Sequence, residues 1–372
     1  MELTATVKLR RMVLEHLSRY TWNAELPDRV YDILQEVRED TPRLRCCVYK
    51  EREVLKDRIN MALNQELRGN IIINAEKALN EPIRRDLPLI DVLPTACDQC
   101  PIDKYYVSDA CRHCLTHKCM NNCPKKAISI VNNRAFIDRD LCVECGMCHK
   151  SCPYGAILEI HRPCVRACAV GALQIGKYKT AQIDHDKCVL CGQCRIACPF
   201  GAIDERSFII PVIESIRAGK EVIAMVAPSI VGQFGMKVKL GQIFNGLLQC
   251  GFSQVHEIGV GADLCCYHEA EDYMEHVPEK QSFMTSSCCP AFVKMLKTHV
   301  EGAEKYISSA GSPMYYSAKL MREQHPDAII VFIGPCIAKK HEQTLFPEYM
   351  DFVLTFEEVM CMMEGKDIKV EN

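Results

Sequence analysis

The sequence predicts an α+β multidomain protein with a helical region at residues 1–90, a cysteine-rich segment at 91–205 and an α/β domain at 206–372. A chain of 372 residues is long enough for two or three domains with cores of their own. Sixteen of its 25 cysteines fall between Cys97 and Cys198. Apolar residues recur at helical spacing before this segment, and short apolar runs that are typical of buried strands follow it.

The helical region shows its period at residues 7–14 and 58–64, and prolines separate its helices. We find no catalytic motif in it and expect an accessory or docking role. The adjacent thiols of Cys46 and Cys47 are expected to be buried structural residues, with metal ligation as the alternative.

The cysteine-rich segment contains an internal repeat, in which a cysteine is followed by a proline or alanine and then by a short turn and an apolar residue. Four copies of this unit occur, at residues 123–128, 152–157, 168–173 and 198–203. The segment has few long apolar runs, so it cannot bury much hydrophobic core. Bound clusters must therefore supply part of its stability.

The spacing C-x2-C-x2-C-x3-C-P at residues 142–153 and 188–199 is the bacterial ferredoxin pattern, in which three cysteines bind one cubane and the fourth binds its neighbour. Residues 111–124 carry the same pattern with two extra residues. Zinc sites with four cysteines also use C-x2-C spacing. The trailing Cys-Pro and the repeated Gly-Ala favour [4Fe–4S] clusters.

Two schemes can pair the halves. The distances of 19 residues from Cys123 to Cys142 and 20 from Cys168 to Cys188 favour joining the first half to the second and the third to the fourth. The alternative joins the second half to the fourth, across 36 residues. Either way we expect about four clusters. In the first scheme their ligand sets are Cys111, Cys114, Cys119 and Cys152; Cys142, Cys145, Cys148 and Cys123; Cys188, Cys191, Cys194 and Cys168; and the remaining Cys97, Cys100, Cys164 and Cys198.

In the α/β domain, residues 221–226 and 328–333 are expected to be buried strands and 291–297 a helix. Cys288 and Cys289 stand beside a helix start, and Cys336 follows a strand with lysines nearby. Helix N–H groups and cations stabilise a thiolate. Cys289 and Cys336 are therefore candidate ligands of one further site, with buried structural cysteine as the alternative. The remaining thiols of this domain are expected to be packing residues, as at Cys250, Cys265 and Cys266.

Residues 285–290 resemble the motif TSCCP with one extra serine, and residues 335–342 resemble PCxxKxxE. These are the first two signature motifs of the [FeFe]-hydrogenases. The order of the ferredoxin repeat, residues 224–229 and residues 261–264 is also similar to that family. The resemblance covers residues 95–372 and is greatest to the branch with extra N-terminal clusters.

The resemblance implies a catalytic H-cluster, a [4Fe–4S] cubane joined through a cysteine to a diiron unit. Its implied cubane ligands in this chain are Cys289 and Cys336, and Ala227 and Pro228 would line the diiron pocket. Cys288 would pass protons to and from the cofactor. Lys339 would donate a hydrogen bond to a cyanide ligand. The family's proton path would run through Glu269, Ser308 and Asp272 toward His276.

The chain departs from the family at Gly334, where a methionine is usual, and at Phe292, where a tryptophan is usual. We also find no third motif, which would supply one further cubane ligand and the bridging cysteine. Cys361 lies in a segment that resembles the stretch upstream of that motif. We expect a fragment incomplete at its C-terminus, with the H-cluster forming only in the full-length parent.

Charged residues make up 25% of the chain and the net charge is −3, so nucleic acid and anionic membranes are not expected partners. We find no signal peptide and no apolar run long enough for a membrane helix, and expect a cytoplasmic protein.

The parent activity implied by the resemblance is the reversible reduction of protons to H2. The expected partners are ferredoxin or another low-potential electron donor or acceptor, together with hydrogenase maturation proteins. The alternatives are a non-catalytic, polyferredoxin-like electron carrier and an iron–sulfur assembly scaffold.

Overall fold

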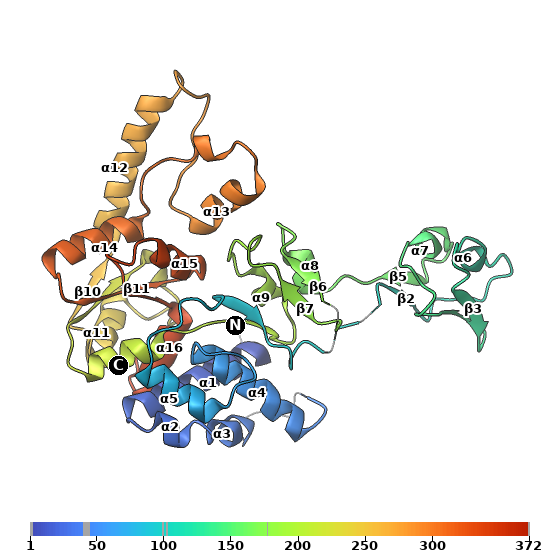
Figure 1. Ribbon diagram of the computed structural model, residues 1–372, viewed down its shortest axis with the longest axis horizontal. Helices are drawn as coiled ribbons and strands as arrows, with labels where there is room; N and C mark the ends of the chain where they lie inside the picture. Colours follow the sequence, from blue (N-terminus) through green and yellow to red (C-terminus); the bar gives the residue numbers. More distant parts are fainter. Residues whose placement is uncertain (1–2, 40–44, 99, 102, 177, 371–372) are drawn as a thin grey trace.

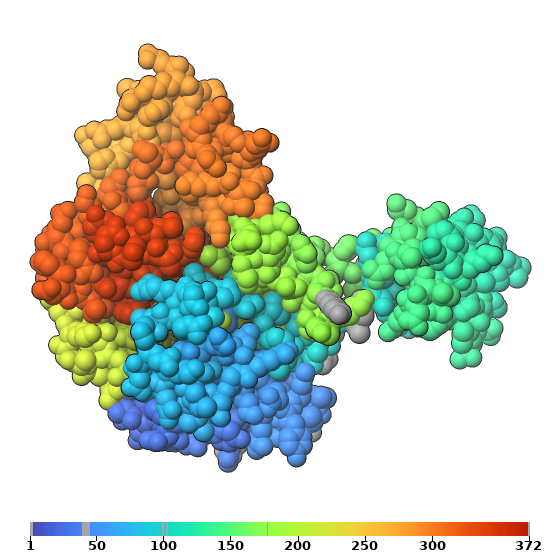
Figure 2. All heavy atoms as spheres, viewed as in Figure 1, coloured from blue at the N-terminus to red at the C-terminus, as the bar shows by residue number. Residues whose placement is uncertain are grey.

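The computed structural model describes residues 3–39, 45–98, 100–101, 103–176 and 178–370. Its main body holds the N-terminal helices and the C-terminal α/β domain, and two cysteine-rich lobes extend from it one after the other (Figure 1). The outer lobe stands apart, joined to the rest by a narrow neck (Figure 2). The α+β organisation predicted from the sequence is confirmed.

The α/β domain is built on a parallel four-stranded sheet with the strand order β10-β9-β11-β12. All five residues of β9 are buried, as expected for a parallel strand covered on both faces. The two strands predicted from apolar runs are confirmed as β9 and β11. The strands are β9 (Val222–Val226), β10 (Gln254–Glu257), β11 (Ile329–Gly334) and β12 (Phe352–Thr355).

Seven helices and two short 3-10 turns of this domain lie in the described part of the chain. Helices α12 and α13 project from the body, at the top of Figure 1. The predicted helix over 291–297 is confirmed as part of α13. The elements are α10 (Ile209–Arg217), η1 (Pro228–Ile230), α11 (Leu240–Cys250), α12 (Gly259–His276), α13 (Pro290–His299), η2 (Glu304–Tyr306), α14 (Pro313–Gln324), α15 (Ala338–Leu345) and α16 (Phe356–Gly365).

The N-terminal helices share a hydrophobic core with the α/β domain. Leu17 of α1, Ile213 of α10 and Met363 of α16 belong to one buried cluster. The indole N–H of Trp22 donates to the carbonyl of Met362 at 3.1 Å. Residues 5–80 therefore pack against the α/β domain, chiefly at α10 and α16, as part of one body. Their helices are α1 (Ala5–Trp22), α2 (Leu26–Arg29), α3 (Ile33–Glu39), α4 (Val48–Ala62) and α5 (Ile71–Asn80).

The two cysteine-rich lobes repeat one topology, in which the first strand pairs antiparallel with the last and a hairpin lies between two short helices. The outer lobe contains β2 (Tyr105–Val107), α6 (Lys118–Asn121), β3 (Ile128–Val131), β4 (Arg134–Ile137), α7 (Met147–Ser151) and β5 (Ile157–Glu159). The inner lobe contains β1 (Ile90–Val92), α8 (Pro163–Ala167), β6 (Leu173–Ile175), β7 (Ala181–Ile183), α9 (Gln193–Ala197) and β8 (Ile203–Glu205).

The outer lobe is inserted into the inner one. Strand β1 and Cys97 precede the outer lobe in the chain, yet β1 pairs with β8, which follows it. The inner lobe is thus complete only because the chain leaves it after Cys100, forms the outer lobe and returns at α8. The alternative pairing of the second half with the fourth is wrong, because these halves lie in different lobes.

Two expectations for other cysteines are wrong. Cys46 is exposed and Cys47 half-buried, because they lie at the N-terminal end of α4, where Cys47 is the N-cap. Cys266 is exposed on the projecting helix α12, while its neighbour Cys265 is buried. Within the described ranges, no helix combines the length and apolar character needed to cross a membrane.

Candidate metal centres

The outer lobe gathers its cysteines into two groups. A cavity beneath β3 and β4 is lined by one group, which consists of Cys123, Cys142, Cys145 and Cys148. Burial raises the pKa of Cys119 in the other group, and the nearby thiols of Cys152 and Cys114 raise it further. Both groups have the composition expected from pairing the first half with the second.

The inner lobe repeats this arrangement. One of its cavities is lined by Cys168, Cys188, Cys191 and Cys194. Burial raises the pKa of Cys164 to about 11, and the neighbouring thiols Cys198, Cys100 and Cys97 act in the same direction. Cys97 and Cys100, which stand far from the repeat in sequence, therefore belong to the fourth group.

Backbone N–H groups point at the thiols in the same way in both lobes. The alanine four residues after each repeat cysteine donates to its sulfur, with N to Sγ distances of 3.3 Å at Cys123, 3.4 Å at Cys152, 3.2 Å at Cys168 and 3.3 Å at Cys198. Such donors stabilise thiolate sulfur and tune bound iron–sulfur clusters.

One further pair of hydrogen bonds identifies the role of Cys97. The first residue of β7, Ala181, donates to Cys97 at 3.2 Å, and Ala135 of the equivalent strand β4 donates to Cys111 at 3.5 Å. Cys97 thus occupies in the inner lobe the position of Cys111 in the outer lobe. Sequence reasoning missed this equivalence, because the insertion separates Cys100 from Cys164.

The thiols fit iron–sulfur clusters in donor type, grouping and N–H surroundings. Two of the groups line a cavity with four cysteines each, as a cubane with one thiolate per iron requires, and in the other two groups neighbouring thiols act on one another. In the part of the chain that is described, no three His, Cys, Asp or Glu side chains form a site for a single metal ion.

The inner lobe adjoins a further cysteine site, which belongs to the α/β domain. Cys168, Cys188 and Cys194 pack against the same apolar cluster as Ala291 and Cys336. The groups therefore succeed one another from the tip of the outer lobe to the body of the protein.

Cys289 and Cys336 are brought together by two helix starts. Cys289 is the N-cap of α13, and Cys336 lies between β11 and α15. Burial raises the pKa of Cys336, the N–H groups of Ala338 and Lys339 lower it, and the neighbouring Cys289 thiol raises it. The two thiols are therefore neighbours in the fold, and their ligation of one cluster stays a prediction.

Lys339 lies at the same place. Its Nζ donates to the carbonyl of Cys288 at 3.2 Å and to Glu342 at 2.6 Å. Ala227 and Pro228 follow β9 directly, and Cys336 follows β11, the strand paired with β9. The carboxyl ends of parallel strands share one sheet edge, which is where such folds place their sites.

The residues expected along a proton path form two groups on α12. Glu269 accepts from the hydroxyl of Ser286 at 2.6 Å and from the N–H of Ser287 at 2.9 Å. Asp272 accepts from Ser308 at 2.7 Å and lies 3.1 Å from Nδ1 of His276.

Ser286 was missed from the sequence, although the extra serine in the motif was its signal. Its hydroxyl lies 3.3 Å from the sulfur of Cys288 and so stands between that thiol and Glu269.

The fold and these sites define an iron–sulfur protein with two ferredoxin-type lobes and an α/β domain that carries cysteines at its sheet edge. Residues 220–372 match the model described as iron only hydrogenase large subunit, C-terminal domain. Residues 135–158 and 181–204 match the 4Fe-4S binding domain. Residues 220–372 therefore carry a domain of the iron-only hydrogenase large subunit kind, and 4Fe–4S binding domains precede it in the chain.

Among its relatives, the periplasmic [Fe] hydrogenase large subunit of Nitratidesulfovibrio vulgaris is 31% identical over 258 residues, 62% of this chain and 58% of the relative. Iron hydrogenase 1 of Clostridium pasteurianum is 29% identical over 140 residues, 33% of this chain and 24% of the relative. An uncharacterized ferredoxin of Methanocaldococcus jannaschii is 31% identical over 85 residues, 20% of this chain and 51% of the relative. The chain thus spans less than two thirds of the length of these relatives.

Proposed function

We propose that this chain, within its full-length parent, relays single electrons through four [4Fe–4S] clusters to a hydrogenase site at Cys289 and Cys336, where protons and H2 are interconverted. The observation that carries the proposal is the succession of four four-cysteine groups that ends beside Cys336. A relay needs a series of centres, and the two lobes, one inserted into the other, place the cysteine groups one after another toward the body.

At the sheet edge, Cys289 and Cys336 would hold the cubane of an H-cluster, which supplies the reaction centre when bound. Lys339, fixed by Glu342, would place an ammonium group beside an anionic ligand of that cluster. Cys288 would exchange a proton with the site. Ser286 would connect its thiol to the carboxylate of Glu269.

The outward half of the proton path would use Asp272, Ser308 and His276 at the far end of α12. Each of these groups can accept and donate a proton, as a relay requires. The partly exposed ring of His276 would then exchange protons with solvent.

The electron partner would be an acidic low-potential carrier such as a ferredoxin. The outer lobe has five exposed basic side chains close in sequence to its cysteines, and opposite charge on a carrier would speed its encounter. These side chains are Arg112, Lys118, Lys125, Lys126 and Lys150. Hydrogenase maturation proteins would be needed to assemble the diiron unit.

The test is anaerobic expression with maturation factors, followed by iron and sulfide analysis, EPR spectroscopy and a hydrogen-evolution assay with a strong reductant. We expect about sixteen iron atoms per chain in the two lobes. Hydrogen evolution should disappear in Cys336→Ala, with the four lobe clusters retained. The same assay is made on a version extended along its native reading frame, where activity is expected. Four clusters without hydrogen evolution in both unmutated forms would leave an electron carrier and refute the catalytic part.

A further inference from the structure

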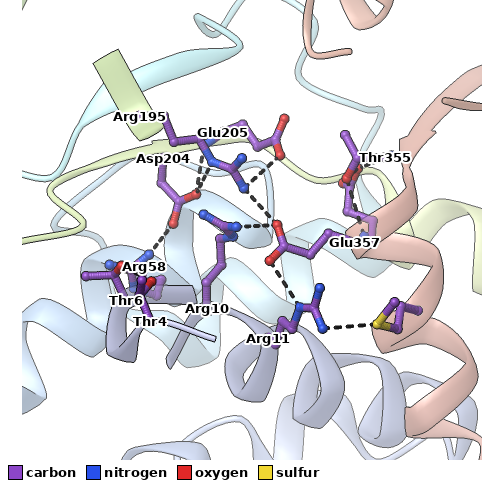
Figure 3. Close-up of polar contacts among 12 residues, drawn as sticks. Thr4, Thr6, Arg10, Arg11, Arg58, Arg195, Asp204, Glu205, Thr355 and Glu357 are labelled. Carbon is purple, nitrogen blue, oxygen red and sulfur yellow. Dashed lines mark hydrogen bonds and ion pairs between the residues drawn. The ribbon is translucent and has the colours of Figure 1, made fainter. Parts of the chain in front are cut away.

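A network of buried ion pairs joins the N-terminal helices, the inner lobe and the α/β domain (Figure 3). Its centre is Arg195 of α9, whose side chain is only 14% exposed. The Arg195 guanidinium lies 3.1 Å from Glu205 of β8, 3.0 Å from Glu357 of α16 and 3.5 Å from Asp204. One cation of the inner lobe thus contacts carboxylates from two parts of the fold.

Helix α1 completes the network from the other side. Arg10 forms an ion pair with Glu357, and Nε of Arg11 lies 3.3 Å from the same carboxylate. Glu357 is therefore shared by two cations of the N-terminal region and one of the inner lobe (Figure 3).

Helix α4 adds a second buried contact. Arg58 pairs with Asp204, and both side chains are 3% exposed. Arg58 also donates to the carbonyl of Gly201 at 2.7 Å. Burial acts to raise the pKa of Asp204, but Arg58, Arg10 and Arg195 lower it below its usual range, so the carboxylate stays charged. Four guanidinium groups thus face the three carboxylates Asp204, Glu205 and Glu357, which leaves an excess of positive charge.

This charge lies against the segment that joins the two inner cysteine groups. Arg195 follows Cys194 directly in the chain, and its backbone N–H donates to the carbonyl of Gly192 at 3.1 Å. Gly201, which accepts from Arg58, precedes Ala202, whose N–H donates to Cys198. Apolar residues of α4 also pack around Cys97 and Cys198. The outer lobe has His149 at the position of Arg195, and this ring contacts the carbonyl of Ile157 instead.

We propose that the N-terminal helices are an electrostatic positioning element, which raises the reduction potential of the inner-lobe clusters through Arg195 and its ion-pair network. Reduction adds a negative charge to a cluster, so excess positive charge in a buried site favours the reduced form. The carboxylates moderate this effect and hold the guanidinium in place. The inference rests on the proposed iron–sulfur relay and gives residues 5–62 a role in it.

The test uses the full chain loaded with clusters and an EPR-monitored redox titration of each signal. Arg195→Gln should make an inner-lobe cluster harder to reduce, by about threefold or more in its reduction equilibrium. Glu357→Gln should shift the same signal in the opposite direction, because it removes a compensating anion. Arg10→Gln, which leaves Glu357 less neutralised, should shift it in the direction of Arg195→Gln.

Two controls separate charge from structure. Arg195→Lys keeps the charge and should restore most of the potential. Arg166→Gln removes an exposed cation that lies two residues after Cys164 but outside the network, and its shift should be smaller than that of Arg195→Gln.

The proposal is overturned if Arg195→Gln leaves the potentials unchanged, or if it and Glu357→Gln shift them in the same direction, as general loosening of the fold would. Absence of cluster signals in the unmutated protein would refute the relay itself and this inference with it. Cluster signals whose reduction potentials do not change in the network variants would refute this inference alone.

Discussion

Lys340 of α15 is fully buried, and its replacement by methionine should strongly destabilise the helix that follows Cys336. Its Nζ lies 2.8 Å from Glu358 of α16 and donates to the carbonyl of Arg206 at 2.7 Å. These contacts tie α15 to α16 and to the segment that leaves the inner lobe. Methionine keeps the volume of the side chain, so the substitution removes charge with little change in packing.

The magnitude follows from what the substitution leaves behind. Removing one partner of a buried ion pair costs about 3–5 kcal/mol, because the other charge stays buried. Glu358 would keep the hydrogen bonds from the N–H and hydroxyl of Thr355, at 2.6 Å and 2.9 Å. We therefore expect the lower end of that range, about 3 kcal/mol, which corresponds to about a 100-fold increase in local opening.

The measurement is hydrogen exchange of peptides from α15 and α16 in the cluster-loaded protein, since local opening is read directly there. The double variant Lys340→Met/Glu358→Gln should recover most of the lost protection, because neither partner of this ion pair is then left charged and unpaired. Exchange in Lys340→Met within about threefold of the unmutated rate would contradict the reasoning, as would a double variant no better protected than the single one.

Three further predictions concern other parts of the chain. Cys164→Ser should remove the cluster assigned to Cys97, Cys100 and Cys198 and leave the outer-lobe EPR signals unchanged. Burial acts to raise the pKa of Asp272, but hydrogen bonds from Ser308 and Ser309 outweigh it and lower that pKa. The stabilisation of α12 by this carboxylate should therefore be complete above the ordinary pKa of an aspartate and be lost as pH falls through the lowered pKa. Hydrogen exchange should show this loss in the unmutated chain and not in Asp272→Asn. Leu17→Ala should cost about 2–5 kcal/mol in denaturant unfolding, in a transition that includes the α/β domain because the two share one core.

The cysteine spacing predicted most of the metal-binding arrangement. A run such as 142–153 brings its thiols together through local turns, so its grouping depends little on distant parts of the chain. The strands at 222–226 and 329–334 were predictable for a similar reason, because a parallel strand buried on both faces is a short apolar run. The membership of Cys97 in the fourth group depended on spacing and elimination until the fold placed it beside Ala181.

The sequence by itself therefore determined the presence of ferredoxin-type modules, their local cysteine groupings and the two motifs of the hydrogenase domain, because these patterns are local and chemically restrictive. Only the tertiary structure decided that one lobe is inserted into the other, that α1 and α4 pack against the α/β domain and inner lobe, and that Arg10, Arg58 and Arg195 share one charge network. Long-range pairing and buried ion pairs join residues far apart in the chain, and a single arginine carries no signal of which carboxylate it will meet.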